Sequence, residues 1–320
     1  MTTKTKFELK MGVATREAFG KALVELGRQN KDVVALDADL SKSTYTNYFA
    51  KEFPDRFIEC GIAEANMMGI GAGLASVGKI PFAASFSCFA INKGFEQLRV
   101  AVAYPKINLK VVGTHSGISI GEDGPSQMSI EDLGLACSLP GFVVLSPADE
   151  VSMRALVFAA AEHVGPVFLR AGRPKAPIVH TSDQKFQIGG SVRLVDGKDV
   201  TIIAHGLLVA EAIRAQETLD AAGISARVVD LYSIKPMDRE AIRRASADTG
   251  AIVVAEEHLI ETGLGVRVAQ VVAEVGPCPM EFVGIDDTYA ESGTPEELMQ
   301  KYGLVAPNIV SAAKKVLTRK

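Results

Sequence analysis

A segment rich in glycine and polar side chains runs from Gly113 to Ser126 and reads GTHSGISIGEDGPS. Its four glycines let the backbone turn tightly and approach a ligand closely. The same segment carries His115, Glu122 and Asp123, side chains that can bind polar groups or transfer protons. The composition also fits an ordinary surface loop, but long loops within compact domains are more often functional. The segment is therefore the first candidate site.

A single carboxylate stands in the apolar run CGIAEANMM, which covers residues 60–68. Glu64 heads a predicted helix that is otherwise built from small and apolar residues. An acid at this place is common without any function, because the helix dipole favours it. In apolar surroundings, however, desolvation raises the pKa of a carboxyl, so that the group can hold and share a proton. This makes Glu64 a candidate for acid–base chemistry.

Two aromatic residues, Phe86 and Phe89, follow each other three positions apart. Such a pair usually belongs to a core, but it can also form the wall of a site for a flat heteroaromatic ring. The remaining histidines are isolated along the chain and are expected to be structural or solvated: His163, His180, His205 and His258.

Apolar β-branched runs alternate with helical patterns through the first half of the chain. The strands are predicted over 32–37, 56–60, 80–85, 107–113, 142–145 and 166–170, and the helices over 15–29, 62–77, 90–103, 130–138 and 151–163. This alternation indicates a parallel sheet covered on both faces. Ligands of such sheets bind at the carboxyl ends of the strands, which is where the candidate segments fall.

A proline- and glycine-containing stretch over 171–187 is predicted to be a linker. A second α/β unit follows it, with strands over 200–204, 226–231 and 251–255 and a helix over 208–222. A further helix begins at the capping box formed by Thr294 and Glu297. We therefore predict two doubly wound α/β domains, over 11–175 and 188–320, and expect only packing and self-association from the second.

Composition excludes several classes of protein. The chain has 320 residues, 48% of them hydrophobic, and a net charge of −4, which argues against disorder and against a duplex nucleic-acid binder. No uncharged stretch is long enough for a membrane helix, and the first ten residues lack the apolar region of a secretory signal. The four scattered cysteines are expected to be free thiols, so the predicted location is the cytoplasm.

The three candidate segments, in this order, resemble the transketolase family of thiamine diphosphate enzymes. The resemblance covers residues 11–320 and is strongest in GIAEANM, GTHSGISIGEDGPSQ and FLRAGRP. It implies a pyrimidine-binding domain followed by a transketolase C-terminal domain, as in the smaller subunit of a split transketolase.

The resemblance implies roles in cofactor binding for one group of residues. Glu64 stands where the family keeps the glutamate that hydrogen-bonds N1′ of the aminopyrimidine and so activates the thiazolium ring. Phe86 and Phe89 match aromatic residues that pack against the pyrimidine, although Asn92 replaces a tyrosine often found three positions further on. The implied cofactor-binding residues are Glu64, Phe89, Phe86, Asp39 and Leu40, the last two at the subunit interface.

A second group is implied to bind substrate. His115 matches the histidine that contacts substrate hydroxyls and joins Glu64 as a catalytic residue, and Asp123 matches the aspartate that binds the C2 hydroxyl. The residues implied to hold a terminal phosphate are Arg16, Ser43 and Arg170, in line with the bidentate bonding of guanidinium groups. Gln127 departs from the histidine common in the family, and we expect altered selectivity among sugar phosphates.

The family binds the diphosphate through Mg²⁺ with a GDG motif, and no GDG or suitably spaced acidic cluster occurs here. The resemblance therefore implies no metal ligand on this chain. It implies an N-terminal partner subunit that carries the diphosphate-binding domain and the Mg²⁺ ligands, and an α2β2 heterotetramer with sites at its interfaces.

The implied activity is transfer of a two-carbon ketol unit from a ketose phosphate to an aldose phosphate. Two other thiamine enzymes remain as alternatives: the β-subunit of a 2-oxo acid dehydrogenase decarboxylating component, and a deoxyxylulose phosphate synthase fragment. The combination of His115 with Asp123 in GEDGP favours transketolase. A non-enzymatic scaffold is a third alternative, which the presence of Glu64 disfavours.

Overall fold

The computed structural model describes residues 8–320. Most of the segment that predicts the absence of a secretory signal, residues 1–7, lies outside this range. Within residues 8–320, no helix has both the length and the apolar character that a membrane crossing requires.

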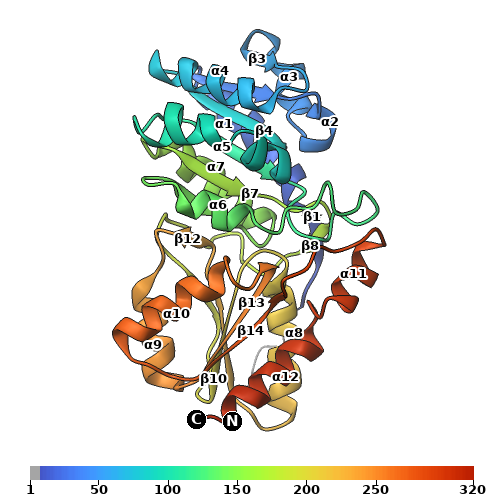
Figure 1. Ribbon diagram of the computed structural model, residues 1–320, viewed down its shortest axis with the longest axis vertical. Helices are drawn as coiled ribbons and strands as arrows, with labels where there is room; N and C mark the ends of the chain where they lie inside the picture. Colours follow the sequence, from blue (N-terminus) through green and yellow to red (C-terminus); the bar gives the residue numbers. More distant parts are fainter. Residues whose placement is uncertain (1–7) are drawn as a thin grey trace.

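Seven strands form the sheet of the first domain (Figure 1). In spatial order they are β12 (Ser233–Lys235), β6 (Val143–Leu145), β7 (Val167–Arg170), β5 (Lys110–Thr114), β4 (Ile80–Phe86), β2 (Val33–Asp37) and β3 (Phe57–Glu59). All neighbours pair in parallel except β12, which pairs with β6 in the antiparallel direction.

Helices cover both faces of this sheet. They are α1 (Thr15–Gln29), α2 (Ser41–Thr44), α3 (Asn47–Glu52), η1 (Pro54–Arg56), α4 (Glu64–Ser76), η2 (Cys88–Lys93), α5 (Phe95–Gln97), η3 (Leu98–Ala103), α6 (Asp132–Ser138) and α7 (Glu150–Glu162). Because successive residues of a strand face opposite ways, Ala35 of β2 packs in the cluster of α1 and α7, whereas Leu36 packs in that of α4. Two covered faces explain why the strands are apolar throughout.

The second domain has a five-stranded sheet in the order β14 (Met280–Ile285), β13 (Ile252–Leu259), β10 (Val200–Ala204), β11 (Ala226–Asp230) and β9 (Val192–Val195). Only β9 runs antiparallel to its neighbour. The helices of this domain are α8 (Leu208–Ala221), α9 (Arg239–Thr249), α10 (Leu264–Val275), α11 (Pro295–Lys301) and α12 (Ala306–Leu317). The prediction of two α/β domains built on largely parallel sheets is thus confirmed.

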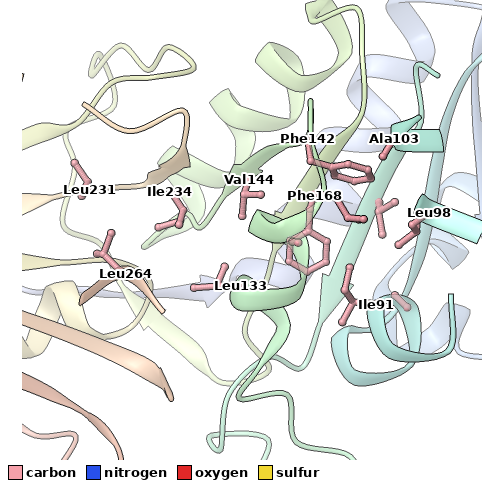
Figure 2. Packing of buried hydrophobic residues seen from close by; sticks show 14 of the residues in the cluster. Ile91, Leu98, Ala103, Leu133, Phe142, Val144, Phe168, Leu231, Ile234 and Leu264 are labelled. Atoms are coloured by element: carbon pink, nitrogen blue, oxygen red, sulfur yellow. The ribbon is translucent and has the colours of Figure 1, made fainter. Parts of the chain in front are cut away.

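The two domains share strands and core at their junction. Strand β12 comes from the second half of the chain but completes the first sheet, and β8 (Lys175–Pro177) pairs with β1 (Met11–Ala14) as a two-stranded ribbon (Figure 1). Figure 2 shows one apolar cluster that continues from Val144 and Leu133 in the first domain to Ile234 and Leu264 in the second. The junction is therefore packed rather than hinged.

Two local predictions differ from the structure. The helix expected over 90–103 is instead two π-helical turns, η2 and η3, on either side of the short α5. The stretch expected to be a linker contains β8, because its residues Lys175 and Pro177 pair with the strand that precedes α1. Pairing between segments so distant in sequence is not visible in local composition.

Candidate active site

Five loops of the first domain meet at the carboxyl edge of its sheet. Asp39 follows β2, Glu64 follows β3, Phe89 follows β4, His115 follows β5 and Arg173 follows β7. Since β2, β3, β4, β5 and β7 are parallel, their carboxyl ends lie along one edge. The parallel order of the strands, rather than proximity in sequence, brings the candidate residues together.

Glu64 forms one end of a row of five side chains, which consists of Glu64, Lys93, Phe89, Phe86 and His115. It is the first residue of α4, its side chain is buried, and its carboxylate oxygens lie 3.4 and 3.5 Å from Nζ of Lys93. The sequence suggested apolar surroundings for Glu64. The structure differs, because Lys93 supplies a cation beside the carboxylate. Lys93 was not singled out in the sequence, and its position four residues after Phe89 is the signal that could have found it.

Aromatic rings continue the row. Nζ of Lys93 lies 4.4 Å from the ring centroid of Phe89, which is stacked on Phe86 at 5.7 Å with an interplanar angle of 11°. Phe86 in turn lies 3.8 Å from the ring of His115. The π-helical turn η2 holds Phe89 and Lys93 together, a local geometry often found at functional sites.

His115 forms the other end of the row in a strained backbone conformation. Its φ is +58°, which is uncommon for a residue with a side chain and is typical of functional positions. Its Nε2 lies 3.1 Å from Nη1 of Arg16, and its Nδ1 lies 2.8 Å from Oγ1 of Thr114. Because Arg16 only donates, Nε2 accepts and Nδ1 carries the proton. Burial, together with Arg16 and Arg173, lowers the pKa of His115 to about 2, so the imidazole is neutral.

Two arginines stand beside this imidazole. Arg16 donates from Nη1 to the carbonyl of Ser43 at 2.8 Å and from Nε to the carbonyl of Arg173 at 3.3 Å. Arg173 donates to the carbonyl of Ile120 at 2.7 Å and to Oε2 of Glu122 at 2.8 Å. Burial lowers the pKa of Arg16, and its side chain is partly desolvated. Both cations fit an anionic substrate group.

Arg170, also predicted to bind a phosphate, lies apart from these two cations in a buried network, and its phosphate-binding role stays a prediction. Its buried guanidinium donates to Oδ2 of Asp132 at 2.8 Å and to the carbonyls of Ser129 and Glu257 at 3.3 and 2.9 Å. These bonds use Nε and Nη2 of the guanidinium. Arg173, the second arginine of FLRAGRP, lies beside Arg16, and the sequence signal that could have found it is a second arginine three residues after the end of β7.

The other predicted substrate residues lie on the loop after β5. Asp123 is exposed, and Gln127 is half-buried with its Nε2 3.5 Å from Oγ of Ser126. Asn92 is exposed and donates to Oε1 of Glu131 at 2.7 Å. The side-chain hydrogen bonds of Gln127 and Asn92 within residues 8–320 thus go to Ser126 and Glu131 rather than to the row.

The loop that carries Asp39 and Leu40 is shaped by Asp37, which the sequence reading did not select. Asp37 accepts from the N–H of Leu40 at 2.6 Å and from the hydroxyls of Thr44 and Thr46 at 2.6 and 2.8 Å. Burial raises the pKa of Asp37 to about 6. Asp39 has a φ of +61° and an exposed side chain, which leaves it free to face another chain.

Comparison with known proteins extends over both domains. Residues 11–178 match the transketolase pyrimidine binding domain, and residues 189–309 match the transketolase C-terminal domain. The chain is 44% identical over 307 residues to a putative transketolase C-terminal section of Methanocaldococcus jannaschii, covering 94% of this chain and 96% of the relative. It is 39% identical over 305 residues to a 6-deoxy-6-sulfo-D-fructose transketolase subunit of Clostridium sp., covering 95% of each.

A solved structure agrees with these sequence matches. A split-gene transketolase, described as an inactive β4 tetramer, superposes with a TM-score of 0.91 and 51% identity, covering 96% of this chain and 99% of that chain. Within the described residues 8–320, no group of three or more His, Cys, Asp or Glu side chains could hold a metal ion. The residue pattern, the fold and the matches across both domains agree, and the chain belongs to the transketolase family, where it is similar to the separate C-terminal sections of split transketolases.

Proposed function

We propose that the chain is the subunit of a thiamine diphosphate-dependent transketolase that transfers a two-carbon ketol unit from a ketose phosphate to an aldose phosphate. The observation that carries the proposal is the row Glu64, Lys93, Phe89, Phe86 and His115, which ends beside Arg16 and Arg173. A buried carboxylate, a flat aromatic wall, a neutral base and a pair of cations follow in that order.

The residues present fit the pyrimidine part of the cofactor. Glu64 is buried, and its only hydrogen-bond contacts within the described residues are the long ones to Lys93, so it retains acceptor capacity. Glu64 would hold the proton at N1′ of an aminopyrimidine, and Phe86 and Phe89 would pack against the ring. When bound, thiamine diphosphate supplies the carbon nucleophile and electron sink that cleavage of a ketose requires.

The remaining residues act on the substrate. Nε2 of His115 is an unprotonated acceptor for a substrate hydroxyl once the Arg16 guanidinium turns to an anion. Arg16 and Arg173 bind a terminal phosphate, and Ser43 fixes Arg16 through its carbonyl oxygen rather than its hydroxyl. Asp123 and Gln127, on the same loop, contact the sugar hydroxyls.

The proposal includes an N-terminal partner subunit that binds the diphosphate and Mg²⁺, in an α2β2 assembly. It is supported by the similarity to C-terminal sections and to a β4 tetramer described as inactive. The four free cysteines are consistent with a reducing compartment, and we place the enzyme in the cytoplasm.

The test is reconstitution with a subunit that carries the diphosphate-binding domain, in the presence of thiamine diphosphate and Mg²⁺. Ketol transfer between sugar phosphates is the expected activity, whereas release of CO₂ from a 2-oxo acid would favour the decarboxylase alternative. Glu64→Gln should abolish most turnover, and Glu96→Gln, at an exposed position, serves as the control. Full turnover in Glu64→Gln would contradict the proposed mechanism.

A further inference from the structure

A buried carboxylate of the second domain contacts the loop that carries His115. We propose that Glu257, on strand β13, is a positioning residue that holds the backbone of the loop carrying His115 and thereby fixes the imidazole at the row. The proposal rests on the proposed function only where turnover is measured.

The contact between Glu257 and the loop is direct. Its Oε1 accepts a hydrogen bond from the N–H of Ser119 at 2.6 Å, and the carboxylate is fully buried. Gly117 has a φ of +82°, and a Cβ added there would overlap the Glu257 carboxylate. Glycine is thus required at this position both for its conformation and for the close approach of the carboxylate. His115, whose φ is also positive, lies two residues before Gly117 in the same loop.

Two other glycines of the loop also lie against the second domain. A Cβ added at Gly121 would lie 3.0 Å from Cδ of Pro295, and one added at Gly124 would lie 2.5 Å from Oγ of Ser292. Both glycines have positive φ. The loop therefore takes its shape on the surface of the second domain. Of the three residues that it meets there, Glu257, Pro295 and Ser292, only Glu257 has an ionisable side chain.

Arg170 ties the base of the loop to the same strand. The N–H of Gly117 donates to the carbonyl of Ser129 at 2.7 Å and closes the loop. Arg170 donates to that same carbonyl and to the carbonyl of Glu257. Arg170 thus connects the closed end of the loop with the residue that holds its centre.

The network extends to the aromatic pair. Oδ2 of Asp132 accepts from Nε of Arg170 and from Oγ of Ser87, each at 2.8 Å. Ser87 lies between Phe86 and Phe89 in the chain. Bonds to charged groups are stronger and more directional than neutral ones, so this network fixes the rings and the loop relative to one another.

Glu256 provides a matched control on the same strand. It is also buried, but its carboxylate accepts from the N–H groups of Leu264 and Gly265, at 2.6 and 2.8 Å, at the start of α10. The two adjacent glutamates thus hold different segments. The apolar cluster of Figure 2 docks the domains independently of either side chain, so both glutamine variants are expected to fold.

Hydrogen exchange of the full chain tests the positioning without any turnover. In Glu257→Gln, amides of 117–129 should exchange about tenfold faster and those of 264–275 should be unchanged, and Glu256→Gln should show the reverse. In the reconstituted enzyme, Glu257→Gln should lower kcat about tenfold and leave the apparent affinity for thiamine diphosphate unchanged.

A second variant keeps the test decisive if Glu257→Gln does not fold. Gly117→Ala displaces the carboxylate from the other side and should produce the same pattern of exchange. Combining Glu257→Gln with Gly117→Ala should increase the exchange rate little beyond either single variant, because both substitutions disrupt the same contact. Unchanged exchange of 117–129 in either single variant would overturn the proposal. So would equal losses of kcat in the Glu256 and Glu257 variants.

Discussion

A buried histidine lies between two aspartates, and we predict that the protein loses stability at alkaline pH because of it. Nδ1 of His180 lies 3.1 Å from Oδ1 of Asp149, in the first domain, and Nε2 lies 3.2 Å from Oδ2 of Asp230, in the second. All three side chains are inaccessible to solvent. With a carboxylate at each ring nitrogen, the imidazolium is the favoured form. Burial lowers the pKa of His180, but the two carboxylates outweigh it and raise the pKa to about 9.

The sign and size of the effect follow from linkage. The pKa of His180 in the folded state is above its ordinary value of 6.5, so the stabilisation is complete below pH 6.5 and is lost as pH rises through 9. A shift from 6.5 to about 9 corresponds to about 3 kcal/mol of unfolding free energy. Asp149 has its pKa lowered to about 2: burial raises it, but His180 and backbone N–H donors outweigh that. The carboxylate is therefore charged throughout this window.

Urea unfolding of wild type and His180→Gln between pH 6 and 10 measures this contribution. The difference between the two curves removes the other titrating groups, and it should shrink by about 3 kcal/mol over this range. His163→Gln is the matched control, because burial lowers the pKa of His163 and its removal should leave the alkaline loss in place. A difference curve that is flat between pH 6 and 10 would refute the reasoning.

Three further predictions concern the arginines and Gln127. Arg173→Ala should raise the KM for sugar phosphates about tenfold, because it removes a charge-assisted bond, and leave urea stability unchanged. Arg170→Ala should lower the unfolding free energy by about 3 kcal/mol, since it leaves Asp132 buried without its cation, as urea titration would show. Gln127→His should change the ratios of kcat/KM across a panel of aldose acceptors, and identical ratios would count against a role in selectivity.

Local patterns were sufficient to predict several of the elements that carry the candidate residues, although not the π-helical turn that holds Phe89 and Lys93. The positions of Glu64, Phe86 and His115 follow from apolar runs that end in polar or glycine-rich segments, and parallel strands bring such ends to one edge. The different surroundings of Arg170 and Arg173 could not be predicted in this way. Arg170 is the last residue of β7 and points into the junction, whereas Arg173 lies three residues beyond, where the chain has turned toward Arg16.

The histidines show a second limit of sequence reasoning. His180, His205 and His258 are isolated in sequence, yet each is buried beside carboxylates or hydroxyls from distant segments. His258 accepts from the N–H of Leu133 through Nε2 and faces the carbonyl of Leu259 through Nδ1, so it is neutral. Such partners are brought together by the docking of two domains, which no periodicity within one segment encodes.

The charged groups at the junction are best explained as groups that fix the orientation of the loop and the aromatic rings, rather than as groups that hold the two domains together. Apolar side chains of similar volume often stabilise a protein as well as buried ion pairs do, and the cluster of Figure 2 already joins the domains. Apolar contacts, however, tolerate small shifts, whereas Glu257, Arg170 and Asp132 have defined partners at 2.6 to 2.9 Å. The row must hold His115 at a fixed place relative to Phe86, and this requires polar groups with defined partners. The second domain, from which the sequence suggested only packing and self-association, therefore has a structural part in shaping the site.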